Sequence, residues 1–137
     1  MFIAHTRWIA TVFSAFFLLC APAPLLAQTQ LGADIDGESA EDGSGTVALS
    51  SDGNRLAIGA PGNDGNGSES GHARVYQWSG MAWTQLGADI DGESAGDRSE
   101  LVSLSSDGNR LAIGAPRNDG NGMGSGHARI YQWSGMA

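Results

Sequence analysis

The feature that most constrains this fold is an internal repeat of 55 residues. Residues 28–82 align with residues 83–137 without a gap, and only ten of the 55 positions differ. The stretch LSSDGNRLAIGAP occurs letter for letter at 49–61 and again at 104–116. Repeats of this length are typical of proteins whose units cannot cover their own apolar faces and therefore stack on neighbours. We expect two equivalent modules, 28–82 and 83–137.

Residues 1–27 differ in kind from the repeats and are typical of a secretory signal peptide. One basic residue, Arg7, precedes the apolar run WIATVFSAFFLLCAPAPLLA, which ends at the small residue Ala27. A membrane anchor is the alternative interpretation, but Pro22 and Pro24 interrupt the run. We expect a signal helix that is cleaved after Ala27, leaving a secreted or cell-surface protein with no stable membrane span.

The repeats are acidic and contain neither lysine nor cysteine. The chain has 7 basic and 15 acidic residues, a net charge of −8, and removing Arg7 with the signal segment makes it −9. Such a chain is repelled by phosphate backbones and anionic lipid, which argues against nucleic acid as a partner. Without a disulfide, the repeats must be stabilised by burial or by assembly.

Within each unit the pattern predicts short β-strands joined by turns. Apolar residues alternate with small or polar ones on both sides of Asp52-Gly53 and of Asp107-Gly108, a dipeptide that favours the turn of a β-hairpin. We expect structural turns there. The expected strands are 47–50, 55–60 and 72–78 in the first unit, followed by a fourth at 83–90, where the second unit begins. No stretch of ten or more residues in the repeats has helical periodicity.

Four short strands per unit match the blade of a β-propeller, which indicates an all-β fold of two four-stranded antiparallel blades. Propellers usually close with four to eight blades, so two blades make an incomplete ring. The interpretation that we favour is a fragment of a longer array. The alternative is self-association, in which three or four copies supply six or eight blades.

The motifs resemble the FG-GAP repeat, the unit of the integrin α-subunit propeller. The run V-x-L-x-x-D-G-x-R-L-A-I-G-A-P is followed by a Gly/Asn/Asp loop and then by GHARVYQW, as in the variant found in secreted or surface proteins of microbes. Residues 59–61 and 114–116 match the GAP half of the name, whereas 45–46 and 100–101 lack Phe-Gly. The resemblance covers both units. The TolB-like propeller is the alternative family.

The resemblance implies a non-enzymatic propeller that presents loops for extracellular binding or cell adhesion, with a protein or glycan as its ligand. Two alternatives remain open: a passive structural spacer, and the propeller domain of an extracellular lyase or hydrolase. Units this alike place equivalent residues around a ring, which favours repeated binding over one asymmetric catalytic centre.

The integrin repeats also carry a calcium loop, D-x-D-x-D-G-x-x-D, between their first two strands. The corresponding segment here is SSDGNR, with one carboxylate per unit, whereas calcium takes six to eight oxygen ligands. Another acidic loop, present in each copy, offers several carboxylates around a glycine turn, which makes calcium a candidate cofactor. Solvated side chains on a strand are the alternative interpretation. The candidate ligands are Asp34, Asp36, Glu38 and Asp42, and Asp89, Asp91, Glu93 and Asp97.

One histidine per unit, His72 and His127, opens a strand beside glycine. A catalytic histidine needs a nucleophile and an orienting acid, but the repeats contain no cysteine, and their serines sit in turns where local hydrogen bonds use the hydroxyls. We therefore expect structural histidines and no enzyme. One histidine per unit and no thiolate also argue against zinc.

The large aromatic side chains of the repeats are expected to pack between the blades, because few other residues are large enough to fill that space. A stacking platform for a sugar or peptide is the alternative. The residues are Tyr76, Trp78, Trp83, Tyr131 and Trp133.

Overall fold

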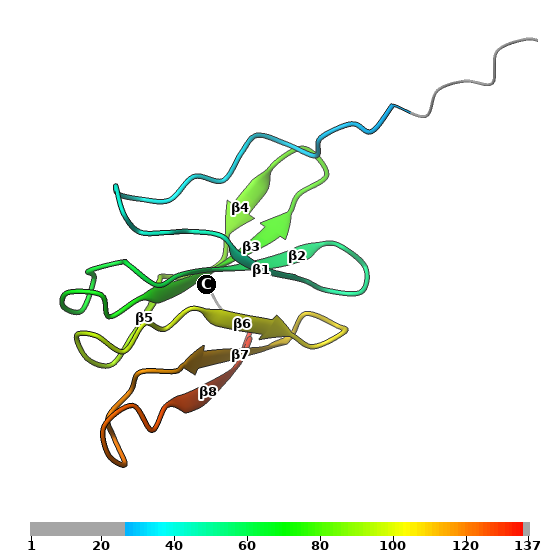
Figure 1. Ribbon diagram of the computed structural model, residues 1–137. Helices are drawn as coiled ribbons and strands as arrows, with labels where there is room; N and C mark the ends of the chain where they lie inside the picture. Colours follow the sequence, from blue (N-terminus) through cyan, green and yellow to red (C-terminus); the bar gives the residue numbers. More distant parts are fainter. Residues whose placement is uncertain (1–26, 136–137) are drawn as a thin grey trace, which may run out of the picture.

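The computed structural model describes residues 27–135, and over this range the chain is all-β, without a helix, as the sequence predicts. The strands form two antiparallel sheets, one above the other in Figure 1. The predicted signal helix, 1–27, lies outside the described part except for Ala27. Within 27–135 there is no helix of the length and apolarity that a membrane crossing requires.

The first sheet has five strands in the order β1-β2-β3-β4, with β5 also paired to β3. Its strands are β1 (Thr46–Leu49), β2 (Arg55–Ala60), β3 (His72–Trp78), β4 (Trp83–Gln85) and β5 (Ile90–Asp91). The fourth strand expected at 83–90 is thus two short strands. Tyr76 pairs with Gln85 and Ala73 with Ile90, so residues 86–89 face only two residues of β3. This extra length forms a bulge.

The second sheet repeats the first three strands in the order β6-β7-β8. They are β6 (Leu101–Leu104), β7 (Arg110–Ala115) and β8 (His127–Gln132). The register is the same in both sheets, since Val47 pairs with Ile58 and Val102 pairs with Ile113. Up to residue 135, no strand pairs with the outer side of β8.

An aspartate stabilises each of the five-residue turns that join β1 to β2 and β6 to β7. In the second, Ser105 Oγ donates to Asp107 Oδ1 at 2.6 Å and the Asn109 backbone N–H donates to the same oxygen at 3.0 Å. These bonds favour the ionised carboxylate and lower the pKa of Asp107 to about 2. Equivalent bonds lower the pKa of Asp52.

The sheets stack by combining small side chains of the first with large ones of the second. Ala57 and Ala73 form one buried cluster with Leu111 and Ile113. This pairing of small with large lets the sheets approach closely. The approach is closest at Gly59, where an added Cβ would lie 1.9 Å from the Glu100 carbonyl oxygen.

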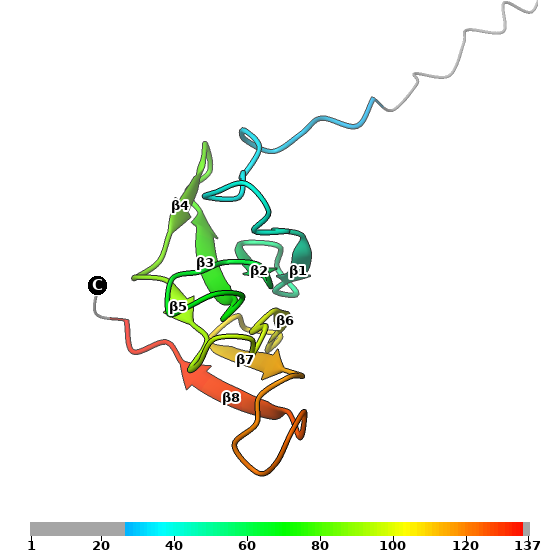
Figure 2. The same ribbon diagram turned by 60° about the vertical axis from the view of Figure 1, so that its left-hand side comes forward.

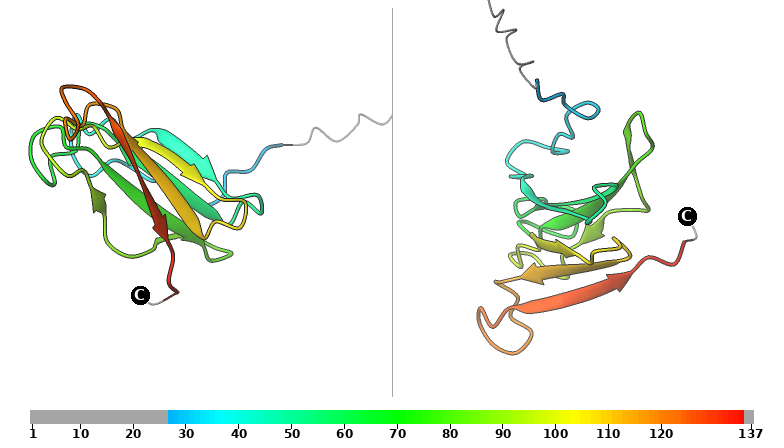
Figure 3. Two further views of the ribbon diagram at one scale, coloured as in Figure 1. Left: turned by 90° about the horizontal axis from the view of Figure 1, so that it is seen from below. Right: turned by 90° about the vertical axis from the view of Figure 1, so that its right-hand side faces the viewer.

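A segment without strands, 27–45, covers the side of the first sheet that faces away from the second (Figures 2 and 3). Arg74 Nη2 donates to the Asp36 carbonyl at 2.8 Å. In the second copy Arg129 Nη2 donates to the Asp91 carbonyl at 2.6 Å. Residues 28–45 therefore contact the first sheet much as 83–100 contact the second.

Candidate functional site

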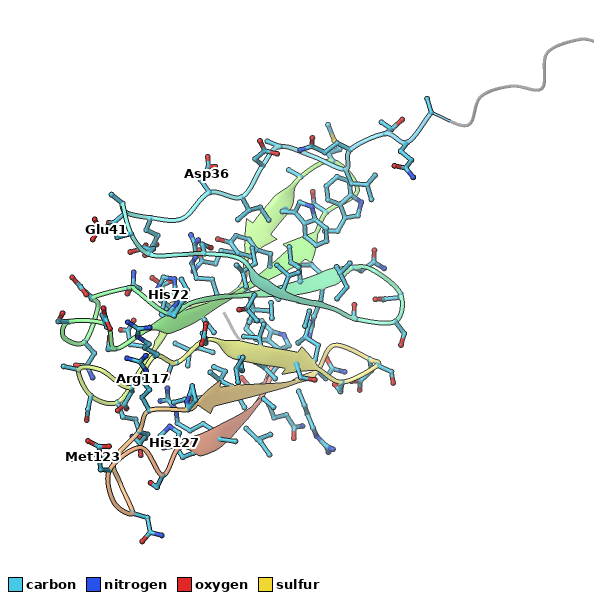
Figure 4. The ribbon with its side chains drawn as sticks, in the orientation of Figure 1. Asp36, Glu41, His72, Arg117, Met123 and His127 are labelled. Carbon is cyan, nitrogen blue, oxygen red and sulfur yellow. The ribbon has the colours of Figure 1, made fainter. Side chains whose placement is uncertain are left out.

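The long connections of both copies gather at one end of the stacked sheets, which we call the loop end. It consists of residues 37–44, 61–71, 92–99 and 116–126. In Figure 1 these segments lie on the left, and the two hairpin turns lie on the right. Figure 4 places Glu41, Arg117 and Met123 on the loop end. The loops of the first copy, 37–44 and 61–71, thus form a first tier of this surface, and the equivalent loops of the second copy, 92–99 and 116–126, form a second tier beside it.

The two copies differ most in charge at the loop end. Of the five differences that alter charge, four lie there, and only Gly45/Glu100 lies elsewhere. The differing pairs on the loop end are Glu41/Gly96, Gly43/Arg98, Gly62/Arg117, Ser68/Met123 and Glu69/Gly124. Consequently the first tier has a formal charge of −5 and the second a formal charge of −1. The framework is nearly constant while this surface changes.

Three of these charged residues stand where the other copy has glycine in a left-handed backbone conformation. Glu41, Glu69 and Arg98 have φ values of 69°, 52° and 51°. The equivalent glycines have φ values between 62° and 82°, and they are Gly96, Gly124 and Gly43. An L-residue in this region costs about 1–2 kcal/mol. Each charge is therefore held at a local cost in stability.

An ion pair between the tiers offsets part of this cost for Glu69 and Arg98. Arg98 Nε lies 2.8 Å from Glu69 Oε2, and Arg98 Nη2 contacts the same oxygen. The backbones are joined as well, because Arg98 N donates to the Glu69 carbonyl at 3.1 Å. Both side chains are partly exposed, so the pair contributes less than about 1 kcal/mol.

A polar cavity of about 430 Å³ opens between the loops 39–42 and 62–69 of the first tier. Its acidic lining residues are Glu41, Asp42, Asp64 and Glu69. Asp64 Oδ1 accepts from the backbone N–H of Glu69 at 2.8 Å, which leaves the loop compact. The Glu41 carboxylate is exposed and has no ion pair or hydrogen bond within residues 27–135. The cavity suits a polar ligand that carries positive charge.

The predicted calcium ligands Asp42 and Asp97 are buried within their own loops. Asp42 accepts from Ser39 N at 3.0 Å and from Asn63 Nδ2 at 3.3 Å. Asp97 accepts from Ser94 N at 3.1 Å and from Asn118 Nδ2 at 2.9 Å. These bonds fasten each acidic loop to the loop that follows β2 or β7.

The other predicted ligands point to different partners. Asp34 and Asp89 each accept a hydrogen bond from a glutamine side chain at 2.7 Å. Asp36 and Asp91 offer their carbonyls to arginines. Within 27–135 the one group of three metal-binding residue types with mutually close ligand atoms is Glu38, His72 and Asp89, and neither predicted set of four forms such a group.

Each histidine lies near one of the remaining two predicted ligands, Glu38 or Glu93, a proximity that the sequence did not predict. His72 Nδ1 lies 3.8 Å from Glu38 Oε2, and His127 Nδ1 lies 3.5 Å from Glu93 Oε2. In each copy an arginine, Arg74 in the first, also lies beside the glutamate. The partners are 34 residues apart in the sequence, and no local motif connects them.

The aromatic side chains divide between the two faces of the first sheet. Trp78 and Trp83 form a cross-strand pair with ring centroids 5.3 Å apart, beside the segment 27–45. Tyr131 packs against the core cluster between the sheets, where it lines a groove of about 200 Å³ with Trp133. Tyr76 is buried, and burial raises the pKa of its hydroxyl.

Comparison of the chain with protein-family models, with curated proteins and with solved structures finds no match. The function therefore has to be inferred from the residues and geometry of the loop end itself.

Proposed function

We propose that this chain is a secreted or cell-surface, non-enzymatic β-propeller segment of the FG-GAP type, and that its loop end binds an extracellular protein or glycan. The observation that carries the proposal is the distribution of differences between the copies. Four of the five charge-altering differences fall on the loop end, while the residues that pair and stack the strands are nearly identical. A surface that varies on a constant frame is typical of binding loops.

The arrangement of the two sheets supports their interpretation as neighbouring blades. The first strands of the two sheets, β1 and β6, lie next to each other, and both sheets direct their long loops to the same end (Figure 1). Asp91 belongs to β5 of the first sheet, and its carbonyl accepts from Arg129 of the second. Stacked sheets of one design, joined in this way, are what a propeller requires.

Ser70, two residues before His72 in the sequence, supports a non-enzymatic function. Ser70 Oγ donates to the Asn63 carbonyl at 3.2 Å and accepts from Asn66 N at 3.2 Å. The hydroxyl is therefore engaged in closing its own loop. A serine nucleophile would instead need a hydrogen bond to a histidine that acts as its base.

The charge of the first tier favours a ligand with cationic groups. Its formal charge is −5, and the cavity beside Glu41 and Glu69 is polar and open. Complementary charge raises the association rate and excludes anionic competitors. The second tier, with Arg98 and Arg117, presents a different pattern to the same ligand or to its neighbour.

The test is a glycan and peptide array probed with the chain as secreted, with and without calcium. Replacing Glu41 and Glu69 by the glycines of the other copy should abolish binding to cationic ligands. Met81→Ala is the matched control, because Met81 is 87% exposed in the turn between β3 and β4, away from the loop end. No binding by a folded chain would contradict the proposal and favour a structural spacer.

A further inference from the structure

His72 is buried with both of its ring nitrogens unpartnered. The residue is 1% exposed at the start of β3, and neither Nδ1 nor Nε2 has a hydrogen bond. The nearest carboxylate oxygen, Glu38 Oε2, lies 3.8 Å from Nδ1, beyond hydrogen-bond distance. A buried polar group without a partner is unfavourable and calls for an explanation, such as an ion bound between these groups.

Two carboxylates converge on this histidine from different segments. Glu38 precedes β1, Asp89 lies in the bulge between β4 and β5, and ligand atoms of the three residues are within 4.8 Å of one another. Figure 4 shows His72 beneath the segment that carries Asp36 and Glu41. A tetrahedral ion with bonds of 2.0–2.2 Å places its ligand atoms about 3.3–3.6 Å apart. Because the Glu38 side chain is 41% exposed, it is free to make this small movement.

We propose that Glu38, His72 and Asp89 bind one divalent transition-metal ion, of which Zn²⁺ is the representative, with water as the fourth ligand. An imidazole with two carboxylates is a borderline donor set that suits zinc, whereas calcium and magnesium take oxygen ligands alone. One histidine per unit without a thiolate disfavours zinc, but here two carboxylates from other segments complete the set of ligands.

Arg74 positions the glutamate without occupying the same oxygen. Arg74 Nη1 lies 3.8 Å from Glu38 Oε1, whereas His72 faces Oε2. Arg74 Nη2 is held by the Asp36 carbonyl, so the guanidinium stays beside the carboxylate. One oxygen of Glu38 is thus left to the ion.

The second copy provides a matched control within the same chain. His127 and Glu93 are placed in the same way, at 3.5 Å, but no third carboxylate joins them within residues 27–135. Two protein ligands bind zinc more weakly than three. We expect one Zn²⁺ per chain at the first site, and no second binding event of similar affinity.

The experiment is a calorimetric titration of the tag-free secreted chain with Zn²⁺ alone. We expect His72→Gln and Asp89→Asn each to weaken binding at least tenfold, and His127→Gln to leave it unchanged. Asp89 is partly exposed and outside the strands, so Asp89→Asn keeps the test decisive if His72→Gln fails to fold. Substitution by Co²⁺ should give the intense visible absorption of a tetrahedral ion that includes a nitrogen ligand.

Equal Zn²⁺ affinity in the wild type and Asp89→Asn would overturn the proposal, as would an equal loss in His127→Gln. Calcium binding at the same affinity would also overturn it, because the imidazole would then contribute nothing. The readout uses zinc alone and is therefore independent of whether the loop end binds a ligand.

Discussion

Gly59 and Gly114 occupy the same place in β2 and β7, but an added methyl group would meet different surroundings in the two copies. Neither glycine has a positive φ, so alanine is acceptable to both backbones. A Cβ at Gly59 would lie 1.9 Å from the Glu100 carbonyl oxygen and 2.7 Å from its carbonyl carbon. The three atoms nearest to a Cβ at Gly114 would all belong to the Leu101 side chain, the closest at 3.2 Å. Gly59→Ala should therefore separate the sheets, whereas Gly114→Ala should be tolerated.

The difference in the free energy of unfolding follows from these contacts. Overpacking costs about 1–3 kcal/mol, and the upper value applies at Gly59 because the clash is with backbone. Glu100 cannot move alone, since its N–H donates to the Gly114 carbonyl at 3.1 Å. Gly114→Ala gains about 0.4–1 kcal/mol from the unfolded chain, less the cost of a tight contact. We expect the two variants to differ by about 3 kcal/mol, a large part of a total stability of about 5–15 kcal/mol.

Urea denaturation followed by tryptophan fluorescence and circular dichroism measures this difference. The midpoint of Gly59→Ala should fall well below that of the wild type, and Gly114→Ala should stay within about 1 kcal/mol of it. An unchanged m value would show that both variants unfold from a similarly compact state. Equal stability of the two variants would refute the close approach of the sheets at Gly59.

Three further predictions concern other parts of the chain. Glu41→Gly should raise the free energy of unfolding by about 1 kcal/mol in the same urea assay, because it relieves a left-handed backbone at φ 69°; a loss of stability would show that Glu41 makes a compensating contact. The folded-state pKa of Asp107, about 2, lies below its usual value of 3.8, so its contribution to stability is present above about pH 4 and is lost as the pH falls toward 2. The midpoint of thermal unfolding between pH 2 and 6 should therefore depend less on pH in Asp107→Asn than in the wild type. The same pH dependence in both proteins would contradict this prediction. A peptide with the sequence of residues 29–40 should bind to the outer side of β8, since 84–95 has the same sequence and includes β5 and most of β4, which pair with β3. Fluorescence anisotropy of the labelled peptide measures this binding, and a scrambled peptide is the control.

The sequence predicted the first three strands of the first unit closely because local pattern determines them. The expected strands 55–60 and 72–78 coincide with β2 and β3, and 47–50 is displaced by one residue from β1. Alternating apolar residues and the Asp-Gly turn are sufficient for such a hairpin. The bulge at 86–89 was missed, although Gly87, with a φ of 71°, is its local signal.

Features that depend on partners distant in sequence could not be predicted in this way. Residues 29–40 and 84–95 have the same sequence, yet only the second stretch contains strands, because only it lies against an available edge, that of β3. The cluster at His72 likewise joins residues from three segments. No periodicity brings Glu38 to a histidine 34 positions later, so this site required the three-dimensional arrangement.

The boundaries of the sheets do not coincide with those of the sequence repeat. The first sheet takes β1 to β3 from one copy, and β4 and β5 from the next. A shortened chain that ended at residue 82 would therefore expose the outer edge of β3, and one that ended near residue 99 would keep the first sheet whole. The gain or loss of one 55-residue unit in evolution adds or removes both the strands that complete the preceding sheet and the first three strands of the next sheet. The number of units can therefore change while the contacts between neighbouring sheets stay the same.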